Sequence, residues 1–235
     1  MDVIAAFSSA FSLIFSLDAD FLHIVAVSLT VTGLAVGLAA LIGLPLGAWL
    51  ALARFPGRAG LVILINSMMG LPPVVAGLVL FLLLSRSGPL GGLGWLFSTR
   101  AMVLAQMLLV LPIIIALTRQ IIEDLWGEYK DYLTSLRLTG WRAIPTLLFD
   151  ARFSLVTALL AGLGRASAEV GAVLVVGGNI AGHTRTMTTA IALETSKGDL
   201  PLALGLGLVL ISLTVLINAL TYGISRIGAR FSGAV

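Results

Sequence analysis

Long apolar stretches separated by short polar ones dominate this chain of 235 residues. The apolar stretches lie near residues 22–52, 61–84, 100–118, 153–176 and 202–223. About 20 residues of helix cross a hydrocarbon core of roughly 30 Å, so each stretch is long enough to span a membrane, and the first should tilt or extend beyond it. None has the apolar–polar alternation of a barrel strand. The pattern predicts an all-α, polytopic membrane protein with five transmembrane helices.

A shorter apolar stretch precedes the first expected span. Residues 3–17, VIAAFSSAFSLIFSL, are too few to cross a membrane comfortably and contain interleaved serines. We expect an interfacial helix there, lying along the membrane. The sequence shows no internal repeat and no disordered linker, so residues 1–235 are expected to form a single transmembrane domain.

The composition agrees with this class. Apolar residues make up 59% of the chain, charged residues 11%, and the mean hydropathy is +1.10. The chain has no cysteine, which excludes disulfides and thiolate metal sites. His23 and His183 are far apart and form no metal-binding pair, so no metal site is expected.

Positive charges are distributed unevenly among the loops. No Lys or Arg precedes Arg54. With the N-terminus outside, nine basic residues fall in inner segments and four in outer loops, which follows the positive-inside rule and places the C-terminus in the cytoplasm. This topology explains the pI near 9.8, so nucleic acid is not implied as a partner. The inner residues are Arg54, Arg58, Arg119, Lys130, Arg137, Arg142, Arg152, Arg226 and Arg230, and the outer residues are Arg86, Arg100, Arg185 and Lys197.

Glycines and prolines inside the spans indicate close packing and irregular helices. Glycine pairs four residues apart, at positions 33 and 37 and at positions 43 and 47, let helices approach closely. Pro72 and Pro73, in NSMMGLPPVVAG, leave backbone carbonyls without their usual partners. The two prolines either bend a helix that lines a pore or form a simple packing kink, and the sequence leaves both open.

Arg165 and Glu169 are the charged residues of the fourth expected span. Four residues apart on one helix, they would face the same side and could pair. Ionisable residues inside a membrane usually mark a pathway or a subunit interface, and an internal salt bridge is the alternative.

The most polar segment follows, with residues 169–199 reading EVGAVLVVGGNIAGHTRTMTTAIALETSKGD. Its amide, four hydroxyls, imidazole and guanidinium, with no carboxylate between Glu169 and Glu194, suit an oxyanion and would serve a cation poorly. The alternative is a polar loop in which Thr184 caps the next helix. The donors are Asn179, His183, Thr184, Arg185, Thr186, Thr188 and Thr189.

The long inner segment 119–152 carries charges of both signs in equal number, with aromatic and aliphatic residues between them. Such an amphipathic cytoplasmic segment is a natural docking surface for another protein, and a solvated loop with local ion pairs is the alternative. Its charged residues are Arg119, Glu123, Asp124, Glu128, Lys130, Asp131, Arg137, Arg142, Asp150 and Arg152.

No motif for nucleotide binding or catalysis is present. The sequence lacks a G-x-x-x-x-G-K-[ST] loop and a G-x-S-x-G serine. Moving an oxyanion inward against a negative-inside potential requires energy. The energy must come from ATP on a partner subunit or from a co-transported ion, as in a secondary oxyanion transporter. Five helices are few for a pathway, so we expect two copies around a two-fold axis.

The polar segment also resembles the signature GGNI-x-G-x-TR-x-MTTAIALETSKGD of the permease subunits of tungstate-type ABC importers, which are related to molybdate permeases. NSMMGLPPVVAG is similar to the pattern of the same family. The resemblance implies a type I importer permease in the cytoplasmic (inner) membrane that translocates tungstate or molybdate and binds no cofactor itself. It implies as partners two ATP-binding ABC subunits on the cytoplasmic face and an extracytoplasmic tungstate- or molybdate-binding protein.

The resemblance and the chemistry of the side chains together assign expected roles to two groups of residues. In the family, the position of 119–152 holds the EAA loop, a coupling helix that docks on the ATP-binding subunit. A register beginning at Asp131 places Tyr132 and Leu133 at the two alanines and Arg137 at the usual glycine. The expected coupling residues are Asp131, Leu136, Arg137, Gly140 and Trp141. The residues expected to line the translocation pathway or its gate are Arg165, Glu169, Asn179, His183, Thr184, Arg185, Thr186, Thr188 and Thr189.

Overall fold

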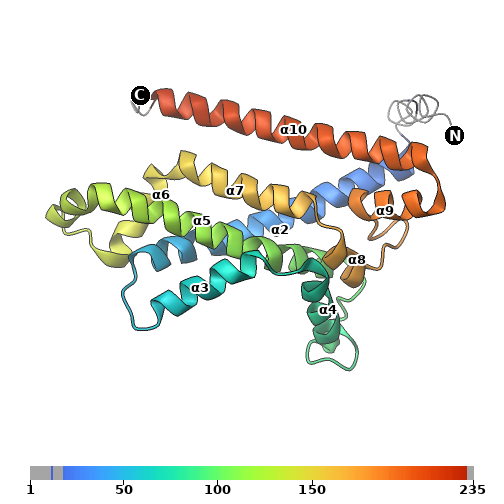
Figure 1. The fold of residues 1–235 in the computed structure, drawn as a ribbon, viewed down its shortest axis with the longest axis horizontal. Helices are drawn as coiled ribbons and strands as arrows, with labels where there is room; N and C mark the ends of the chain where they lie inside the picture. Colours follow the sequence, from blue (N-terminus) through green and yellow to red (C-terminus); the bar gives the residue numbers. More distant parts are fainter. Residues whose placement is uncertain (1–11, 13–17, 232–235) are drawn as a thin grey trace. The chain divides into compact units, whose positions relative to one another are not determined.

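The computed structural model describes residue 12 and residues 18–231, and every regular element among them is a helix (Figure 1). In chain order the elements are α2 (Ala19–Leu52), α3 (Arg58–Met69), α4 (Pro73–Leu84), η1 (Gly91–Leu93), α5 (Thr99–Ser135), η2 (Gly140–Ala143), α6 (Ile144–Asp150), α7 (Arg152–Ser167), α8 (Gly171–Gly177), α9 (Met187–Lys197) and α10 (Leu200–Phe231). The interfacial helix expected at 3–17 lies outside the described residues, apart from Ser12.

Among the described residues, three stretches of helix are long and apolar enough to cross a membrane: Ala19–Leu52, Thr99–Ser135 and Leu200–Ala219. They correspond to the first, third and fifth expected spans. Two bent pairs meet the same criterion only when their halves are taken together, namely α3 with α4 and the Gly140–Asp150 segment with α7. The all-helical, polytopic class is confirmed, whereas the number of five spans stays a prediction.

The second expected span, 61–84, is not one helix. α3 ends at Met69 and α4 begins at Pro73. Pro72 lies between them in an extended conformation, with φ −62° and ψ 126°, because a residue that precedes a proline is disfavoured in the helical region. Pro73 occupies the first turn of α4, where its missing N–H is no loss. The prolines therefore separate two helices, and the expectation of a bend or kink within one helix is wrong.

The fourth expected span, 153–176, is also interrupted, because α7 and α8 are separate helices with a break at 168–170. Glu169 lies in this break, so the expectation that it shares a helix face with Arg165 is wrong. Side chains stabilise the break. The Glu169 carboxylate accepts the Ala172 N–H at 2.8 Å, and Gln106 Nε2 donates to the Ala166 carbonyl at 3.1 Å.

The chain divides into two compact units. The first unit comprises Met1–Ala35, Pro72–Gln106 and Ala166–Ile217, and the second comprises Val36–Leu71, Met107–Arg165 and Asn218–Val235. In the first unit, one buried cluster joins α2, α9 and α10. Its members are Phe21, Ile24, Met187, Ala190 and Leu206. The expectation of a single transmembrane domain stays a prediction.

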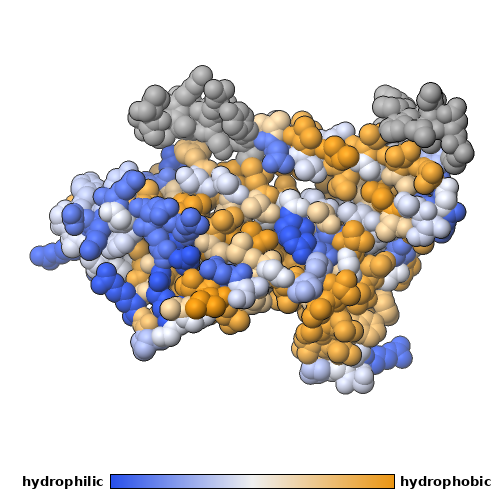
Figure 2. Space-filling model, in the orientation of Figure 1, coloured by the Kyte–Doolittle hydropathy of each residue, from blue (hydrophilic) through white to orange (hydrophobic). Residues whose placement is uncertain are grey.

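Helices α4 and α8 of the first unit lie side by side (Figure 1) and approach closely through a glycine. A Cβ at Gly77 of α4 would lie 2.8 Å from the Ala172 Cα of α8, so a larger residue would force the helices apart. The surface of α4 is hydrophobic in Figure 2. Its large exposed side chains are Val74, Val75, Leu78, Val79 and Leu82. Such a surface suits contact with lipid or with another membrane helix.

The core of the second unit gathers residues of α2, α5, η2, α6 and α7. Its buried members are Ala48, Ile122, Leu133, Ala143, Leu147, Ala151 and Leu155. An ion-pair group adds to this unit: Glu123 of α5 pairs with both Arg58 and Arg119. Arg58 Nε also donates to the Leu50 carbonyl at 3.0 Å. Arg58 therefore connects the start of α3 to the end of α2 and to α5.

The two glycine pairs of α2 differ in their surroundings. A Cβ at Gly43 would meet the Ile114 side chain of α5 at 2.8 Å, and one at Gly47 would lie 2.7 Å from the Ile115 carbonyl oxygen. At positions 33 and 37, a Cβ would meet no atom of the described chain within 4 Å. Of the two pairs, the one at 43 and 47 therefore brings α2 against α5.

Gly47→Ala should destabilise the protein, because the added methyl group collides with the α5 backbone and overpacking costs about 1–3 kcal/mol. Gly33→Ala is the matched control in the same helix. It should leave stability unchanged or raise it, since Ala favours a helix over Gly by roughly 1 kcal/mol. Thermal unfolding of the purified protein in detergent measures the difference. Equal Tm values for the two variants would contradict the packing of α2 against α5.

Candidate functional site

The polar segment lies in the first unit, where residues 178–186 connect α8 to α9. α8 ends because Gly178 adopts a φ of 71°, a left-handed conformation that suits glycine, and Asn179 follows with a φ of 50°. The three N–H groups of residues 183–185 then converge on the Ile180 carbonyl at 3.0–3.2 Å. These backbone donors are occupied within the loop and are not available to a ligand.

Thr184 fixes the shape of this loop. It is 1% exposed, its Oγ1 donates to the Gly177 carbonyl at 2.6 Å, and the same oxygen accepts the Ile180 N–H at 2.9 Å. The hydroxyl therefore ties the loop to the end of α8. Thr184 does not cap α9, so the alternative interpretation, in which it caps the next helix, is wrong on this point.

The N-cap of α9 is Thr186, in a reciprocal arrangement with Thr189. The Thr186 hydroxyl accepts the Thr189 N–H at 3.4 Å, and Thr189 Oγ1 accepts the Thr186 N–H at 3.0 Å. Each hydroxyl satisfies a backbone donor that has no partner within the helix. Both residues are buried, so their hydroxyls serve the fold of the segment.

Two further hydroxyls attach the segment to its neighbours in the first unit. Ser28 of α2 accepts the Met187 N–H at 2.7 Å, and Thr188 Oγ1 donates to the Glu169 carbonyl at 2.8 Å. Glu169 is therefore brought together with the polar segment, whereas Arg165 belongs to the second unit. Sequence reasoning missed Ser28, and the available signal was a hydroxyl inside an apolar span.

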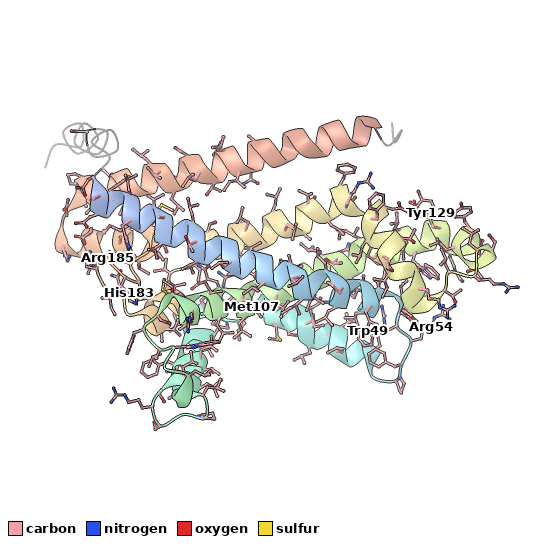
Figure 3. The ribbon with its side chains drawn as sticks, turned by 180° about the vertical axis from the view of Figure 1, so that it is seen from behind. Trp49, Arg54, Met107, Tyr129, His183 and Arg185 are labelled. Atoms are coloured by element: carbon pink, nitrogen blue, oxygen red, sulfur yellow. The ribbon has the colours of Figure 1, made fainter. Side chains whose placement is uncertain are left out.

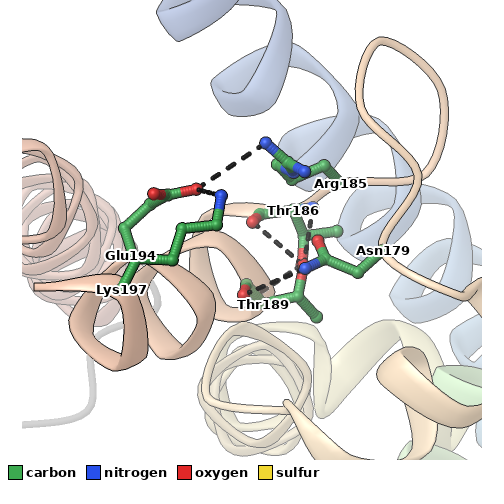
Figure 4. A network of polar contacts seen from close by, with 6 residues as sticks. All are labelled: Asn179, Arg185, Thr186, Thr189, Glu194 and Lys197. Atoms are coloured by element: carbon green, nitrogen blue, oxygen red, sulfur yellow. Dashed lines mark hydrogen bonds and ion pairs between the residues drawn. The ribbon is translucent and has the colours of Figure 1, made fainter. Parts of the chain in front are cut away.

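A buried carboxylate faces the positive side chains of the segment (Figure 4). Glu194 of α9 is 5% exposed, and its Oε1 lies 3.0 Å from Lys197 Nζ and 3.8 Å from Arg185 Nη1. The shorter contact is a hydrogen bond, and the longer one is an ion pair beyond hydrogen-bond distance. Arg185, Lys197 and Glu194 together carry a formal charge of +1. Sequence reasoning missed Glu194, because no local pattern in the sequence marks its contact with Arg185.

The donors with capacity left for a ligand are Arg185 and His183. The Arg185 side chain is 21% exposed, and its buried Nε has no hydrogen-bond partner within the described chain. His183 is exposed on the same loop, and Figure 3 shows both side chains there. The Asn179 amide instead contacts the Thr189 carbonyl at 3.5 Å. A guanidinium and an imidazole are suitable donors to an oxyanion.

The expected coupling residues lie in the second unit, where the chain turns from α5 into α6. α5 remains helical to Ser135, so the expected inner loop is a helix over its first half. This is consistent with the strong helix propensity of its Glu, Lys, Arg and Leu residues. A turn and η2 then lead into α6. All five expected residues are exposed: Asp131, Leu136, Arg137, Gly140 and Trp141.

The surface at this end of α5 is largely hydrophilic (Figure 2), and three aromatic side chains are exposed there. Tyr132, Trp141 and Phe149 are 64%, 73% and 66% exposed. The Arg142 guanidinium lies 5.8 Å from the centre of the Trp141 ring, and that of Arg152 lies 4.3 Å from the Phe149 ring. Exposed aromatic residues beside arginines are typical of protein interfaces.

These features define a helical membrane protein with a positively charged polar loop and an exposed aromatic segment. Within residues 18–231, no group of three potential metal ligands occurs. No family model matches the chain.

Three relatives nevertheless cover most of the sequence. The chain is 40% identical to a probable anion ABC transporter permease protein of Haloferax volcanii, over 88% of this chain and 89% of that protein. It is 36% identical to the tungstate uptake system permease protein TupB of Peptoclostridium acidaminophilum, over 96% and 100%. It is 38% identical to TupB of Campylobacter jejuni, over 70% and 69%. The chain belongs to the ABC transporter permeases.

Membership of this family confirms that the chain is a multi-pass permease subunit rather than an enzyme. ABC permeases act with separate ATP-binding subunits, and those of uptake systems also act with a binding protein. The alternative of an ion-coupled carrier finds no support among the three relatives. The roles of individual residues stay predictions.

Thr186→Ala should lower the free energy of unfolding by about 1 kcal/mol, because the start of α9 loses its cap. Thr186→Ser keeps an oxygen at the same place and should retain most of that stability. Thermal unfolding of the purified variants measures both effects. If Thr186→Ala unfolded at the wild-type temperature, the reciprocal cap would contribute nothing to the fold.

Proposed function

We propose that this chain is the membrane permease of an importer for tungstate or for the similar dianion molybdate. The observation that carries the proposal is its 36% identity to a tungstate uptake permease over 96% of this chain and all of that protein. The loop between α8 and α9 supports it, because Arg185 and His183 offer donors to an oxyanion and the loop contains no carboxylate.

Import of a dianion requires an energy source outside this chain. Moving one negative charge inward costs about 2.3 kcal/mol per 100 mV, and a dianion costs roughly twice as much. Two ATP-binding subunits on the cytoplasmic face would supply this energy, and a tungstate- or molybdate-binding protein would deliver the anion to the outer face. The permease would contribute the passage and the coupling.

The proposed topology has five spans in the cytoplasmic membrane, with the N-terminus outside and the C-terminus in the cytoplasm. α2, α5 and α10 would each form one span, α3 and α4 together would form the second, and the 153–176 stretch would form the fourth. The excess of inner over outer Lys and Arg supports this orientation. Two copies would form a homodimer, because one copy has few spans for a pathway.

The nine proposed pathway residues divide into two roles. His183 and Arg185 would contact the passing anion. The remaining residues would have structural roles in the passage: Arg165, Glu169, Asn179, Thr184, Thr186, Thr188 and Thr189. The support for this division is the hydrogen bonding of the three buried threonines, whose hydroxyls are engaged with the backbone or with one another. Transport should therefore depend more on charge at position 185 than on the hydroxyls.

Arg185→Glu should abolish tungstate uptake, because it puts negative charge where the dianion must pass. Arg185→Lys keeps the charge but loses the planar guanidinium, so it should retain partial uptake. The measurement is tungstate accumulation at matched membrane expression, with ATP hydrolysis followed in parallel. Full uptake by Arg185→Glu would show that this loop only packs, and would remove the chemical support for oxyanion passage.

The exposed segment around η2 is proposed to dock on the ATP-binding subunit. Its residues Asp131, Leu136, Arg137, Gly140 and Trp141 would form the contact. Trp141 is the strongest candidate, because a largely exposed Trp beside an arginine is typical of residues that dominate binding. The docking would transmit the ATPase cycle to the permease.

Trp141→Ala should weaken assembly with the ATP-binding subunit by about 2 kcal/mol, which is roughly thirtyfold in Kd. Thr139→Ala, exposed in the same turn, is the matched control and should assemble normally. Affinity between the purified subunits and transport-coupled ATP hydrolysis are the two readouts. Wild-type values of both for Trp141→Ala would show that the partner docks elsewhere.

A further inference from the structure

We infer that Glu194 is an internal competitor of the transported anion. Its carboxylate attracts Arg185 while no anion is bound and gives it up when a dianion arrives. Glu194 is thus a positioning residue that acts through Arg185. The inference rests on the proposed function, because it requires that Arg185 contacts the dianion.

The Glu194 carboxylate is buried and lies beside two cations. Its side chain is 7% exposed, and the same oxygen, Oε1, is the one nearest to both Lys197 Nζ and Arg185 Nη1. A buried carboxylate requires such compensation, because removing its charge from water is costly. Figure 4 shows the two cations reaching the carboxylate from different elements, Lys197 from α9 itself and Arg185 from the loop that precedes it.

The two contacts of Glu194 differ in strength and origin. Lys197 is three residues away on the same helix and donates a hydrogen bond at 3.0 Å. The Arg185 contact joins the loop to the helix at 3.8 Å, which is an attraction between charges without a hydrogen bond. Lys197 can therefore keep the carboxylate compensated when Arg185 moves to another anion.

Arg185 also has unused hydrogen-bonding capacity. Its ion pair with Glu194 engages Nη1, while its buried Nε lacks a hydrogen-bond partner within the described chain. A guanidinium carries five N–H donors in a planar fork that matches an oxyanion. A dianion that places two oxygens at hydrogen-bond distance would bring twice the charge of Glu194 at closer range. It would displace the carboxylate from Arg185.

The competition matters because a pathway must release what it binds. Without the Glu194 charge, Arg185 would hold the dianion more tightly and let it go more slowly. With the charge present, Glu194 regains Arg185 as the dianion leaves, which assists release. Removing the charge should therefore raise anion affinity and lower turnover together.

The test uses the complex of this permease with its ATP-binding subunits, and tungstate as the probe. Tungstate should raise the Tm of the detergent-solubilised complex, and the half-saturating concentration is read from that rise. Maximal uptake is measured in proteoliposomes with the binding protein added. Glu194→Gln keeps the side-chain size and removes the charge. It should lower the half-saturating concentration about tenfold and reduce the maximal uptake rate.

The matched control is Asp199→Asn, which also removes one negative charge a short distance along the chain. Asp199 is exposed and accepts the Leu202 N–H at 3.3 Å at the start of α10, and Asn caps a helix as well as Asp. This variant should match the wild type in both readouts. A merely structural role for Glu194 would lower the Tm without tungstate and leave the half-saturating concentration unchanged, which would overturn the inference.

A double variant separates the release of Arg185 from a general charge effect. Glu194→Gln combined with Lys197→Met has the same local formal charge as the wild type, yet Arg185 has lost its competitor. The double variant should still bind tungstate more tightly than the wild type, whereas wild-type affinity would show that only net charge matters and would overturn the inference. If the single variant fails to assemble, the double variant, which keeps the local formal charge of the wild type, provides the same comparison.

Failure of this inference can be distinguished from failure of the proposed function. If wild-type proteoliposomes accumulate no tungstate, the proposed function fails, and the inference fails with it. If the wild type imports tungstate and Arg185→Glu abolishes import, but Glu194→Gln leaves the half-saturating concentration at the wild-type value, only the role of Glu194 fails. That role also fails if the wild type imports tungstate but tungstate raises the Tm of neither complex.

Discussion

Wherever a helix is interrupted in a largely apolar protein, nearby side chains must satisfy the backbone groups that the interruption leaves without partners, because lipid offers neither donors nor acceptors. The first unit meets this constraint in the irregular stretches between α7 and α9. Glu169 accepts a backbone N–H at the start of α8, Gln106 donates to a carbonyl at the end of α7, and Thr184 serves the end of α8. Thr186 and Thr189 cap α9 reciprocally. The geometry of the polar loop follows from these bonds.

This constraint also decides which residues remain for function. The hydroxyls that made the loop resemble an anion site in the sequence are the groups that the fold itself uses. The groups that remain for contact with an anion are the Arg185 guanidinium, whose charge Glu194 partly compensates, and the exposed His183 imidazole. Anion passage through such a loop would depend on one guanidinium whose attraction is partly neutralised by a neighbouring carboxylate. The attraction of Arg185 for an anion would therefore be moderate, which suits transport better than tight binding.

The sequence predicts the parts of this protein that depend on hydropathy and on composition. The helical class, the three long apolar helices and the exposure of the residues around Trp141 follow from such patterns. The break at Glu169 does not follow from hydropathy, because the residues on both sides of it are apolar. A single carboxylate stabilises the helix end there. The cap at Thr186 rather than Thr184 depends on how the loop closes onto the Ile180 carbonyl. The Glu194–Arg185 pair is a tertiary contact that no local pattern reveals.

A weak hold on the anion would have a consequence for selectivity. Tungstate and molybdate share their charge and tetrahedral shape, so discriminating between them requires several well-placed hydrogen bonds in a rigid, desolvated pocket. A loop whose backbone donors are occupied, and whose guanidinium is shared with Glu194, offers too few such bonds. Adding donors would improve discrimination and slow release at the same time. In the proposed importer, the permease would therefore select by charge, and the binding protein would choose between the two dianions.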